Sequence, residues 1–548
     1  MYKYSKGLGV LILLAFLTAT VSAQTSYNGK EEVQNGWHLK DKSKDGVYGI
    51  SLDQAYEFVK GKKSKTVIVA VLDTGIDTTH EDLKSVIWTN PKEIPGNGKD
   101  DDKNGYVDDI HGWNFIGGKD GRSVNDDSYE AARIYHKLKA KYEGADETKL
   151  SKADKVEYEI WQRAKKDVMG DVDVTMLDYL IAIQKNILKG DSVVRKELGK
   201  EEYSCTDLDK YSSSSVDAIK LKLTILALCR GNNSMEITNV DVLDDLAGEI
   251  KKIEAVNNPP KDYRGEIVKD NYSDFNDRYY GNTDIMGNYA LHGTHVAGII
   301  AAARNNHIGI DGVADNVKIM FVRMLPDGDE HDKDVALAIR YAVDNGAQVI
   351  NMSFGKYYSP EKQWVDDAVQ YAQSKGVLLV SAAGNERFNA DSLLHYPNKI
   401  MNSGKMATNW ITVGASGDPK MGGLVSSFSN YGKLDVDVFA PGEKIYSTVP
   451  GGNKYRDLSG TSMASPVVTG LAAFILSYYP DLSAEQVKYV IETSVIKPGF
   501  KVKKPGTVED VDLSDLSKTG GIINAYQAIK LASTLKGERG NNKNLKAF

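Results

Sequence analysis

Cysteine and proline are both scarce in this chain of 548 residues, which has two cysteines and 14 prolines. Two cysteines are too few for a disulfide-stapled miniprotein, a cysteine-based zinc site or an iron–sulfur cluster. The scarcity of proline and the absence of a Gly-X-Y period exclude a collagen-like or proline-rich protein. The content of 41% hydrophobic and 26% charged residues is instead typical of a globular protein.

Long runs of basic residues are also missing, and the formal net charge is −7. A protein that binds nucleic acid through a basic surface is therefore disfavoured. The charge pattern does not indicate an oligomeric state.

Membrane-length apolar runs are absent after the first residues of the chain. Lys3 and Lys6 precede an apolar run over residues 8–21, and small residues follow it at Ser22 and Ala23. This pattern predicts a secretory signal peptide over residues 1–23, with a mature chain that is exported to the periplasm or the extracellular space and has no membrane span. A transmembrane anchor is the alternative, but a span needs about 20 apolar residues.

Apolar, β-branched runs alternate with amphipathic stretches through much of the chain. The runs predict strands at 66–72, 317–323, 348–353, 377–382 and 411–415, and the stretches predict helices at 332–345, 361–375, 463–478 and 524–533. This alternation indicates an α/β fold with a parallel sheet and helices on both faces. Functional residues of such sheets collect at the carboxyl ends of the strands.

The segment 125–271 departs from this alternation, because it has no convincing strand. Its charged amphipathic stretches lie at 129–142, 152–168, 175–188, 216–228 and 240–253. We therefore expect an inserted all-helical subdomain that divides the α/β domain into residues 24–124 and 272–535, with a flexible tail at 536–548. Cys205 and Cys229 both fall in the insertion, where an exported protein favours a disulfide over the alternative of two buried thiols.

Three polar motifs stand out. Asp73 follows the strand at 66–72 and begins Asp-Thr-Gly-Ile-Asp, and His292 opens His-Gly-Thr-His-Val-Ala-Gly at the start of an apolar helix. Ser462 lies in Gly-Thr-Ser-Met-Ala-Ser-Pro, where Gly460 permits a tight turn and Pro466 suits a first helical turn. Ser462 is thus expected at a helix N-terminus, which favours a developing negative charge.

Each motif also has a structural explanation of its own. Asp73 suits a turn or a helix cap, and Ser462 suits an N-cap. His292 and His295 lie one helical turn apart, as in a metal pair, but no glutamate separates them and no third ligand is evident. We expect His295 to be a packed core residue. These local explanations do not account for the three motifs together.

In this order the three motifs resemble those of the subtilisin-like serine proteases, the subtilase or S8 family. The resemblance covers about residues 36–120 and 271–535. It implies a serine endopeptidase that hydrolyses polypeptide substrates through an acyl-enzyme. Ser462 would be the nucleophile, His292 the general base and acid, and Asp73 the residue that orients and stabilises the imidazole. The alternative is a catalytically silent binding or chaperone-like protein on the same scaffold.

Three further segments resemble the family's oxyanion and substrate-binding segments. Residues 382–386 resemble the oxyanion segment, in which Asn385 would donate its amide to the oxyanion beside the Ser462 N–H. Residues 353–355 resemble the segment to which a substrate adds as a strand, and residues 395–397 resemble the floor of the S1 pocket. The substrate-binding residues implied are Ser353, Phe354, Gly355, Ala383, Gly384 and His395.

Two structural calcium sites are expected, and no organic cofactor. Asp82 matches the aspartate of the family's tight calcium site, and the loop 305–310 matches its ligand loop, with a side-chain oxygen from Asn306 and carbonyls from Ile308 and Ile310. The loop 100–108 resembles a second calcium loop without the terminal glutamate of an EF-hand, and a solvated acidic turn is its alternative. Its expected ligands are Asp100, Asp102, Asn104 and Asp108.

The chain also departs from a minimal subtilase. Its helical insertion lengthens the interval between Asp73 and His292, and little room for an inhibitory propeptide precedes Gly36. Because the insertion returns just before His292, we expect it to act as a lid or exosite at the cleft. A remote spacer or partner-docking module is the alternative.

Overall fold

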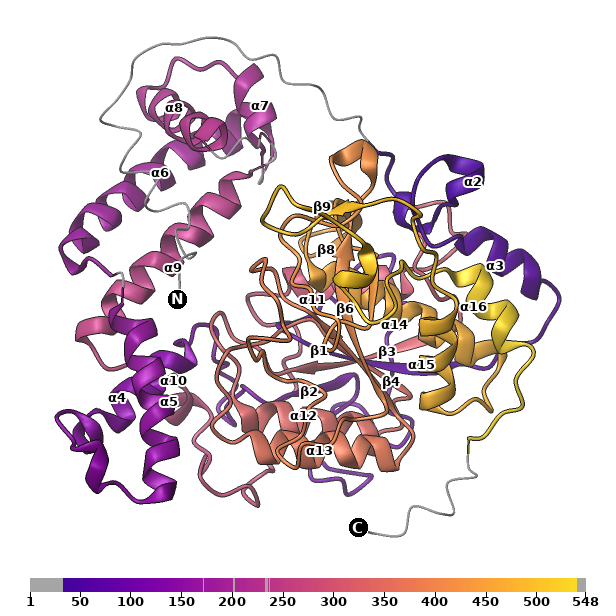
Figure 1. Ribbon diagram of the computed structural model, residues 1–548, viewed down its shortest axis with the longest axis horizontal. Coiled ribbons are helices and arrows are strands. Elements are labelled where there is room, and N and C mark those ends of the chain that lie inside the picture. The colour runs from indigo at the N-terminus through magenta and orange to yellow at the C-terminus, as the bar shows by residue number, and fades with distance from the viewer. Residues whose placement is uncertain (1–32, 171, 201–202, 232–234, 236, 540–548) are drawn as a thin grey trace. The chain divides into compact units, whose positions relative to one another are not determined.

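The computed structural model describes residues 33–170, 172–200, 203–231, 235 and 237–539 (Figure 1). The predicted signal peptide and most of the predicted tail lie outside these residues. Contacts divide the described chain into two compact units, one of residues 131–261 and one of the residues before and after them. The insertion bounds 125 and 271 inferred from the sequence stay a prediction.

A seven-stranded, wholly parallel sheet forms the centre of the larger unit, in the order β2-β3-β1-β4-β5-β6-β7. This confirms the predicted α/β class. The five predicted strands are present, while the short β2 and β7 were not predicted. The strands are β1 Val67–Asp73, β2 Gly112–Asn114, β3 Val317–Arg323, β4 Val349–Met352, β5 Leu378–Ala382, β6 Trp410–Ser416 and β7 Val438–Pro441.

Helices cover both faces of this sheet, because alternate residues of each strand point to opposite sides. Val69 and Val71 of β1 pack into one hydrophobic cluster with α3, α11, α14, α15 and α16. Ala70 and Leu72 pack into a second cluster with α12 and α13 (Figure 1). The bounds are α3 Leu52–Val59, α11 Leu291–Ala301, α12 Asp332–Asp344, α13 Lys362–Ser374, α14 Thr461–Tyr478, α15 Ala484–Thr493 and α16 Ala525–Ala532.

Smaller elements complete this unit. They are α2 Lys42–Asp45, α10 Tyr263–Ile267, the hairpin of β8 Ile445–Val449 and β9 Lys454–Leu458, and the pair β10 Val502–Lys503 and β11 Asp510–Val511. The hairpin holds the helix that carries His292, because Ser447 Oγ and Thr448 Oγ1 each donate to a carbonyl of α11 at 2.8 Å.

One described helix, α14, is long and apolar enough to cross a membrane. Its apolar stretch is 89% buried inside the structure, between the sheet and the helices packed on it. The length and apolar composition of α14 are therefore those of a core helix, and they are weak evidence for a membrane span.

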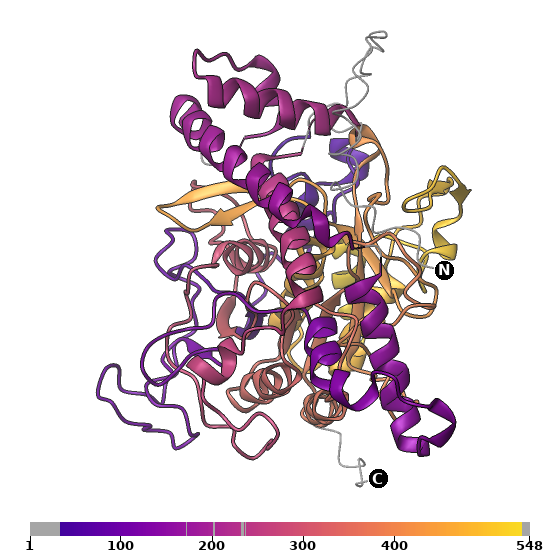
Figure 2. The same ribbon diagram turned by 90° about the vertical axis from the view of Figure 1, so that its left-hand side faces the viewer.

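Helices alone make up the regular structure of the described part of residues 131–261. Besides two short 3-10 helices, Glu147–Lys149 and Val174–Met176, they are α4 Glu130–Tyr142, α5 Lys152–Met169, α6 Leu177–Leu198, α7 Cys205–Lys210, α8 Val216–Gly231 and α9 Asn239–Asn257. The long α6 packs against both α8 and α9 around one hydrophobic cluster (Figures 1 and 2). Cys205 and Cys229 form a disulfide that joins α7 to α8, which confirms the predicted pairing.

Candidate active site

The sheet places the motif residues where its strands end. Asp73 is the last residue of β1 and is fully buried, while His292 and Ser462 are each the second residue of a helix, α11 and α14. Asp73 therefore lies at a strand end, and His292 and Ser462 lie at helix N-termini, as the sequence predicts.

Asp73 and His292 are in direct contact. The Asp73 Oδ1 atom lies 2.7 Å from His292 Nδ1 and also accepts the Thr74 N–H at 2.8 Å. Burial disfavours a charged imidazole, but the charge and hydrogen bond of Asp73 outweigh it and raise the pKa of His292. A carboxylate that binds Nδ1 holds the proton there, so that Nε2 becomes the basic nitrogen.

Ser462 is bound to the segment that follows β4. Its Oγ donates to the Ser353 carbonyl at 3.1 Å, and Ser353 Oγ donates to the Ser462 carbonyl at 3.0 Å. Among the described residues the Ser462 hydroxyl therefore donates to Ser353 and not to His292. Rotation of the Ser462 side chain is needed to bring its proton to the imidazole.

Asn385 is oriented by the residue that precedes Ser462. Its Oδ1 accepts both the N–H and the hydroxyl of Thr461 at 2.9 Å, which leaves Nδ2 free to donate elsewhere. A Cβ atom on Gly460 would lie 3.6 Å from Ser462 N and 3.7 Å from Asn385 Nδ2. The two nitrogens thus border one common space.

Gly384 has a conformation that a side chain would not tolerate. Its φ is +97°, and a Cβ atom there would lie 2.4 Å from Asn430 Nδ2. Its N–H donates to Thr461 Oγ1 at 3.1 Å, and the neighbouring Ala383 is buried. Residues 383–385 are thereby held against the start of α14.

The two segments implied for substrate side-chain recognition also meet. Lys356 and Tyr396 exchange backbone hydrogen bonds at 2.8 and 2.7 Å. A Cβ atom on Gly355 would lie 2.0 Å from His395 Cε1, so the imidazole lies against the Gly355 backbone. Burial lowers the pKa of His395, and the nearby Glu386 opposes this effect. Phe354, which precedes Gly355 in the chain, is buried.

Asn351 is a positioning residue that the sequence did not single out. It is buried on β4, donates to Ser353 Oγ at 3.0 Å and accepts from Ser465 Oγ and Thr469 Oγ1 at 3.0 and 2.9 Å. These bonds tie β4 to the first turns of α14. The sequence carries only an indirect signal for it, which is an asparagine inside an apolar strand together with hydroxyls spaced four apart in an apolar helix.

His295, in contrast, belongs to the core. It is fully buried, its Nε2 lies 2.9 Å from the Arg456 carbonyl, and burial lowers the pKa of His295 to about 3. A neutral imidazole that donates to a carbonyl fits the expected packing role.

The first expected calcium site is assembled from distant parts of the chain. The fully buried Asp82 accepts Asn306 Nδ2 at 2.5 Å, Ile310 N–H at 3.1 Å and Tyr455 Oη at 3.2 Å. Asn306 Oδ1 accepts the Ile308 N–H at 3.1 Å. Asp82 and the expected ligand loop therefore lie together, with N–H groups of Asn306 and Ile310 turned toward the buried carboxylate. A buried carboxylate beside an asparagine amide is compatible with the ligand chemistry of calcium.

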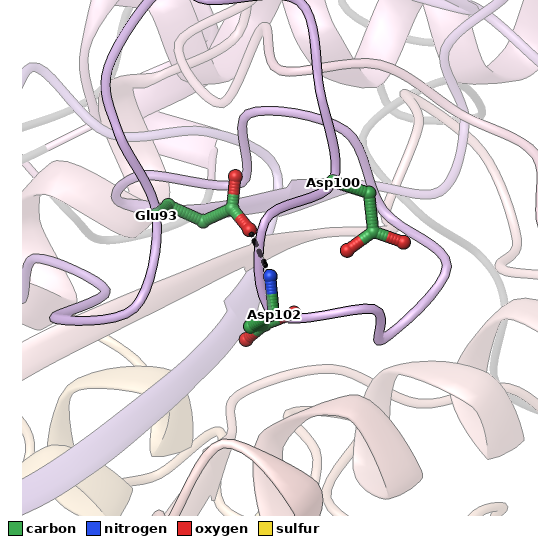
Figure 3. Close-up of side chains that lie close together, drawn as sticks. All are labelled: Glu93, Asp100 and Asp102. Carbon is green, nitrogen blue, oxygen red and sulfur yellow. Dashed lines mark hydrogen bonds between the residues drawn. The ribbon is translucent and has the colours of Figure 1, made fainter.

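The second expected site is only partly brought together. Asp100 and Asp102 lie close to each other and to Glu93, a residue outside the expected ligand set (Figure 3). The Asn104 N–H donates to both Asp100 Oδ1 and Asp102 Oδ1 at 3.1 Å, while its side-chain Nδ2 donates to Asp109 at 3.0 Å. Asp108 accepts the N–H groups of residues 96 and 98 at 3.0 and 2.8 Å.

A parallel sheet with these motifs at its carboxyl edge is the arrangement of subtilisin-like serine proteases, which are peptide-bond hydrolases. The chain belongs to the subtilase family (peptidase S8), whose model matches residues 64–522.

Known proteins resemble parts of the chain. It is 44% identical over 217 residues to a thermophilic serine proteinase of Bacillus sp. (strain AK1), which covers 39% of this chain and 48% of that protein. It is 36% identical over 270 residues to thermitase of Thermoactinomyces vulgaris, over 48% of this chain and 85% of thermitase. The chain thus spans about half the length of the first relative and most of the second.

Among solved structures, a protease from Pseudoalteromonas arctica PAMC 21717 aligns with 90% of this chain and 96% of its own. The sequence identity is 19% and the TM-score 0.45.

Proposed function

We propose that this protein is an exported serine endopeptidase with Ser462 as nucleophile, His292 as general base and acid, and Asp73 as the orienting carboxylate. The observation that carries the proposal is the contact of 2.7 Å between His292 and Asp73. It leaves His292 Nε2 as the proton acceptor and raises the pKa of the ring, which strengthens the base.

In the reaction, the Ser462 hydroxyl turns from the Ser353 carbonyl to His292. Nε2 takes its proton while Oγ attacks the peptide carbonyl carbon. The tetrahedral oxyanion accepts hydrogen bonds from the Ser462 N–H and Asn385 Nδ2, which border the same space. His292 then returns the proton to the leaving amine, and the C–N bond breaks to give the acyl-enzyme.

A water molecule completes the cycle. His292 accepts a proton from the water while the water oxygen attacks the carbonyl carbon of the acyl-enzyme ester. The same two donors bind the second oxyanion. His292 then returns the proton to Ser462 Oγ as the ester bond breaks. Polypeptide substrates add as a strand along residues 353–355, with His395 against one end of this segment. Main-chain recognition of this kind favours extended segments.

Export and calcium are further parts of the proposal. The predicted signal peptide sends the chain to the periplasm or the extracellular space, and the disulfide of Cys205 and Cys229 is of the kind that forms in oxidising compartments. Calcium at Asp82 and the loop 305–310 has a structural role, because a buried carboxylate gains ligation from the ion.

The experiment compares cleavage of an extended peptide by the full chain, Ser462→Ala and the control Ser477→Ala. Ser477 is a buried serine at the other end of α14 whose hydroxyl donates to its own helix. Ser462→Ala should lose nearly all activity, while Ser477→Ala should retain it. A wild-type chain that is folded but cleaves no peptide would instead favour the silent binding protein.

A further inference from the structure

A buried lysine directly follows the segment 353–355 that we propose to bind the substrate backbone. The side chain of this residue, Lys356, is only 1% exposed. Its Nζ atom lies 2.9 Å from Glu130 Oε2 and 3.0 Å from Asp332 Oδ1, and it donates to the Glu330 carbonyl at 2.6 Å. A buried ammonium group has lost its hydration, so these negatively charged and carbonyl oxygens are what hold it there.

The two carboxylates that pair with the lysine are themselves buried and held in place. Asp332, the first residue of α12, also accepts the Ser359 hydroxyl at 2.9 Å and the Glu361 N–H at 2.8 Å. Glu130, the first residue of α4, donates its N–H to Asp329 Oδ2 at 2.7 Å. The lysine side chain is thereby joined to the starts of two helices.

The backbone of Lys356 joins the same segment to the residues that resemble the floor of the S1 pocket. The N–H and carbonyl of Lys356 bond to the carbonyl and N–H of Tyr396 at 2.8 and 2.7 Å. Gly355, the residue before the lysine, lies against the His395 ring. The position of Lys356 therefore sets the spacing between the two segments that would border a P1 side chain.

Between its two fixed ends, the backbone of the segment is left open. Ser353 exchanges hydrogen bonds with Ser462 at one end, and Lys356 is fixed at the other. Among the described residues, no backbone–backbone hydrogen bond involves Phe354 or Gly355. Backbone groups that are held in place in this way are suited to a peptide that adds as a strand.

We propose that Lys356 is a positioning residue that holds the segment 353–355 in place for peptide substrates, through its ion pairs with Glu130 and Asp332. The inference rests on the proposed function and deepens it, because it assigns part of substrate binding to a buried side chain. A backbone that is already fixed loses less freedom when an extended peptide binds, and this preorganisation strengthens binding. The proposal also makes Glu130, where the chain enters α4, a part of this support.

The test measures peptide binding and the reactivity of Ser462 separately in the full chain. Lys356→Met removes the charge and keeps an apolar, unbranched side chain. The matched control is Lys333→Met, because Lys333 is a fully buried lysine of α12 that pairs with Asp270 at 2.6 Å and does not belong to the substrate segment. Steady-state cleavage of an extended peptide gives KM and kcat. The labelling rate with a small fluorophosphonate reports Ser462 without the need for a peptide strand.

Lys356→Met should raise KM for the peptide by about tenfold with a smaller change in kcat, because the segment loses its support while the reacting residues are unchanged. Its labelling rate should stay near that of the parent. Lys333→Met should keep both the parental KM and the parental labelling rate. A purely structural role for both lysines would instead change the two variants alike.

A parental KM in folded Lys356→Met, or an equal rise of KM in both lysine variants, would overturn the inference and leave the proposed function intact. A parent that neither cleaves the peptide nor reacts with the fluorophosphonate would contradict the proposed function, and the inference with it. If Lys356→Met does not fold, Glu130→Gln takes its place, since it keeps the shape of the side chain and removes one of the paired charges. Its KM should rise by roughly threefold, and an unchanged KM would again refute the role of Lys356.

Discussion

Asp73 Oδ1 and His292 Nδ1 lie 2.7 Å apart although 219 positions of chain separate the two residues. Asp73 is the last residue of strand β1 in the parallel sheet, and His292 is the second residue of helix α11. The helices of residues 131–261 lie within this interval of the sequence and leave the contact intact. A pair formed in this way depends on the fold of the sheet, not on proximity along the chain.

The first prediction concerns pH. Burial opposes the charge on His292, but Asp73 outweighs burial and raises the pKa of the ring. Since only the neutral imidazole accepts the Ser462 proton, kcat/KM should rise with pH through a value above the ordinary imidazole pKa of about 6.5.

Asp73→Asn is the matched variant for this profile. It removes the charge that raises the pKa of His292, so the acid limb of the residual activity should shift to lower pH. At the same time kcat should fall by about 10⁴-fold. An acid limb that does not move in Asp73→Asn would separate Asp73 from the titration of His292.

Asn385→Ala should lower kcat by about 10²–10³-fold with little change in KM, because the lost hydrogen bond forms mainly in the transition state. The measurement is steady-state cleavage of one peptide. Thr461→Val should show a smaller loss in the same direction, because it removes one of the two donors that orient Asn385. A wild-type kcat in Asn385→Ala would remove this residue from the mechanism.

His395 should restrict the size of the P1 side chain. Its imidazole lies against Gly355, so His395→Gly should increase cleavage after large aromatic residues in a P1 peptide library. Because burial lowers the pKa of His395, any gain in cleavage after acidic P1 residues should need a lower pH than an ordinary imidazole would require. The same library profile for both proteins would place the His395 ring outside the pocket.

Calcium removal should destabilise the protein at Asp82. In a Ser462→Ala chain, EDTA should lower the melting temperature and added calcium should restore it, because the ion binds only the folded state. Asp82→Asn should reduce this response, since its buried carboxylate is the charged ligand that we propose for the site. A melting curve of Ser462→Ala that ignores both EDTA and calcium would argue against this site.

The helical segment should influence which substrates are cleaved. A variant with residues 131–261 replaced by a Gly-Ser linker keeps Glu130, which forms an ion pair with Lys356, and Arg264, which forms one with Asp334. We expect it to fold and to cleave casein faster, relative to a short peptide, than the full chain does. An unchanged ratio of the two rates would favour a spacer or a docking module over a lid.

The sequence indicates those features that local chemistry determines. The apolar runs predict β1, β3, β4, β5 and β6 because buried parallel strands have no polar face. The short strands β2 and β7 lie directly beside polar residues such as His111 and Asp437, so no longer apolar run marks them in the sequence. The motifs single out Asp73, His292 and Ser462, each of which has a recognisable neighbourhood in the chain.

Residues whose roles depend on distant contacts could not be found in this way. Glu93 lies outside the acidic loop in sequence and joins Asp100 and Asp102 only when the chain turns back. Thr461 and Asn351 act on residues that are 76 and 114 positions away. The oxygens of Asp108, which the alternate carboxylates of the loop suggest as a calcium ligand, accept the N–H groups of residues 96 and 98, a contact that the sequence does not indicate.

The most direct test of the account is stoichiometric labelling by a fluorophosphonate, followed by mass spectrometry of the labelled peptide. The folded chain should be labelled once, on Ser462, at a rate that falls when His292 is replaced by alanine. Ser462→Ala should not react, while Ser477→Ala should react as the parent does. A folded parent that remains unlabelled, or a label on another serine, would contradict the assignment of Ser462 as the nucleophile.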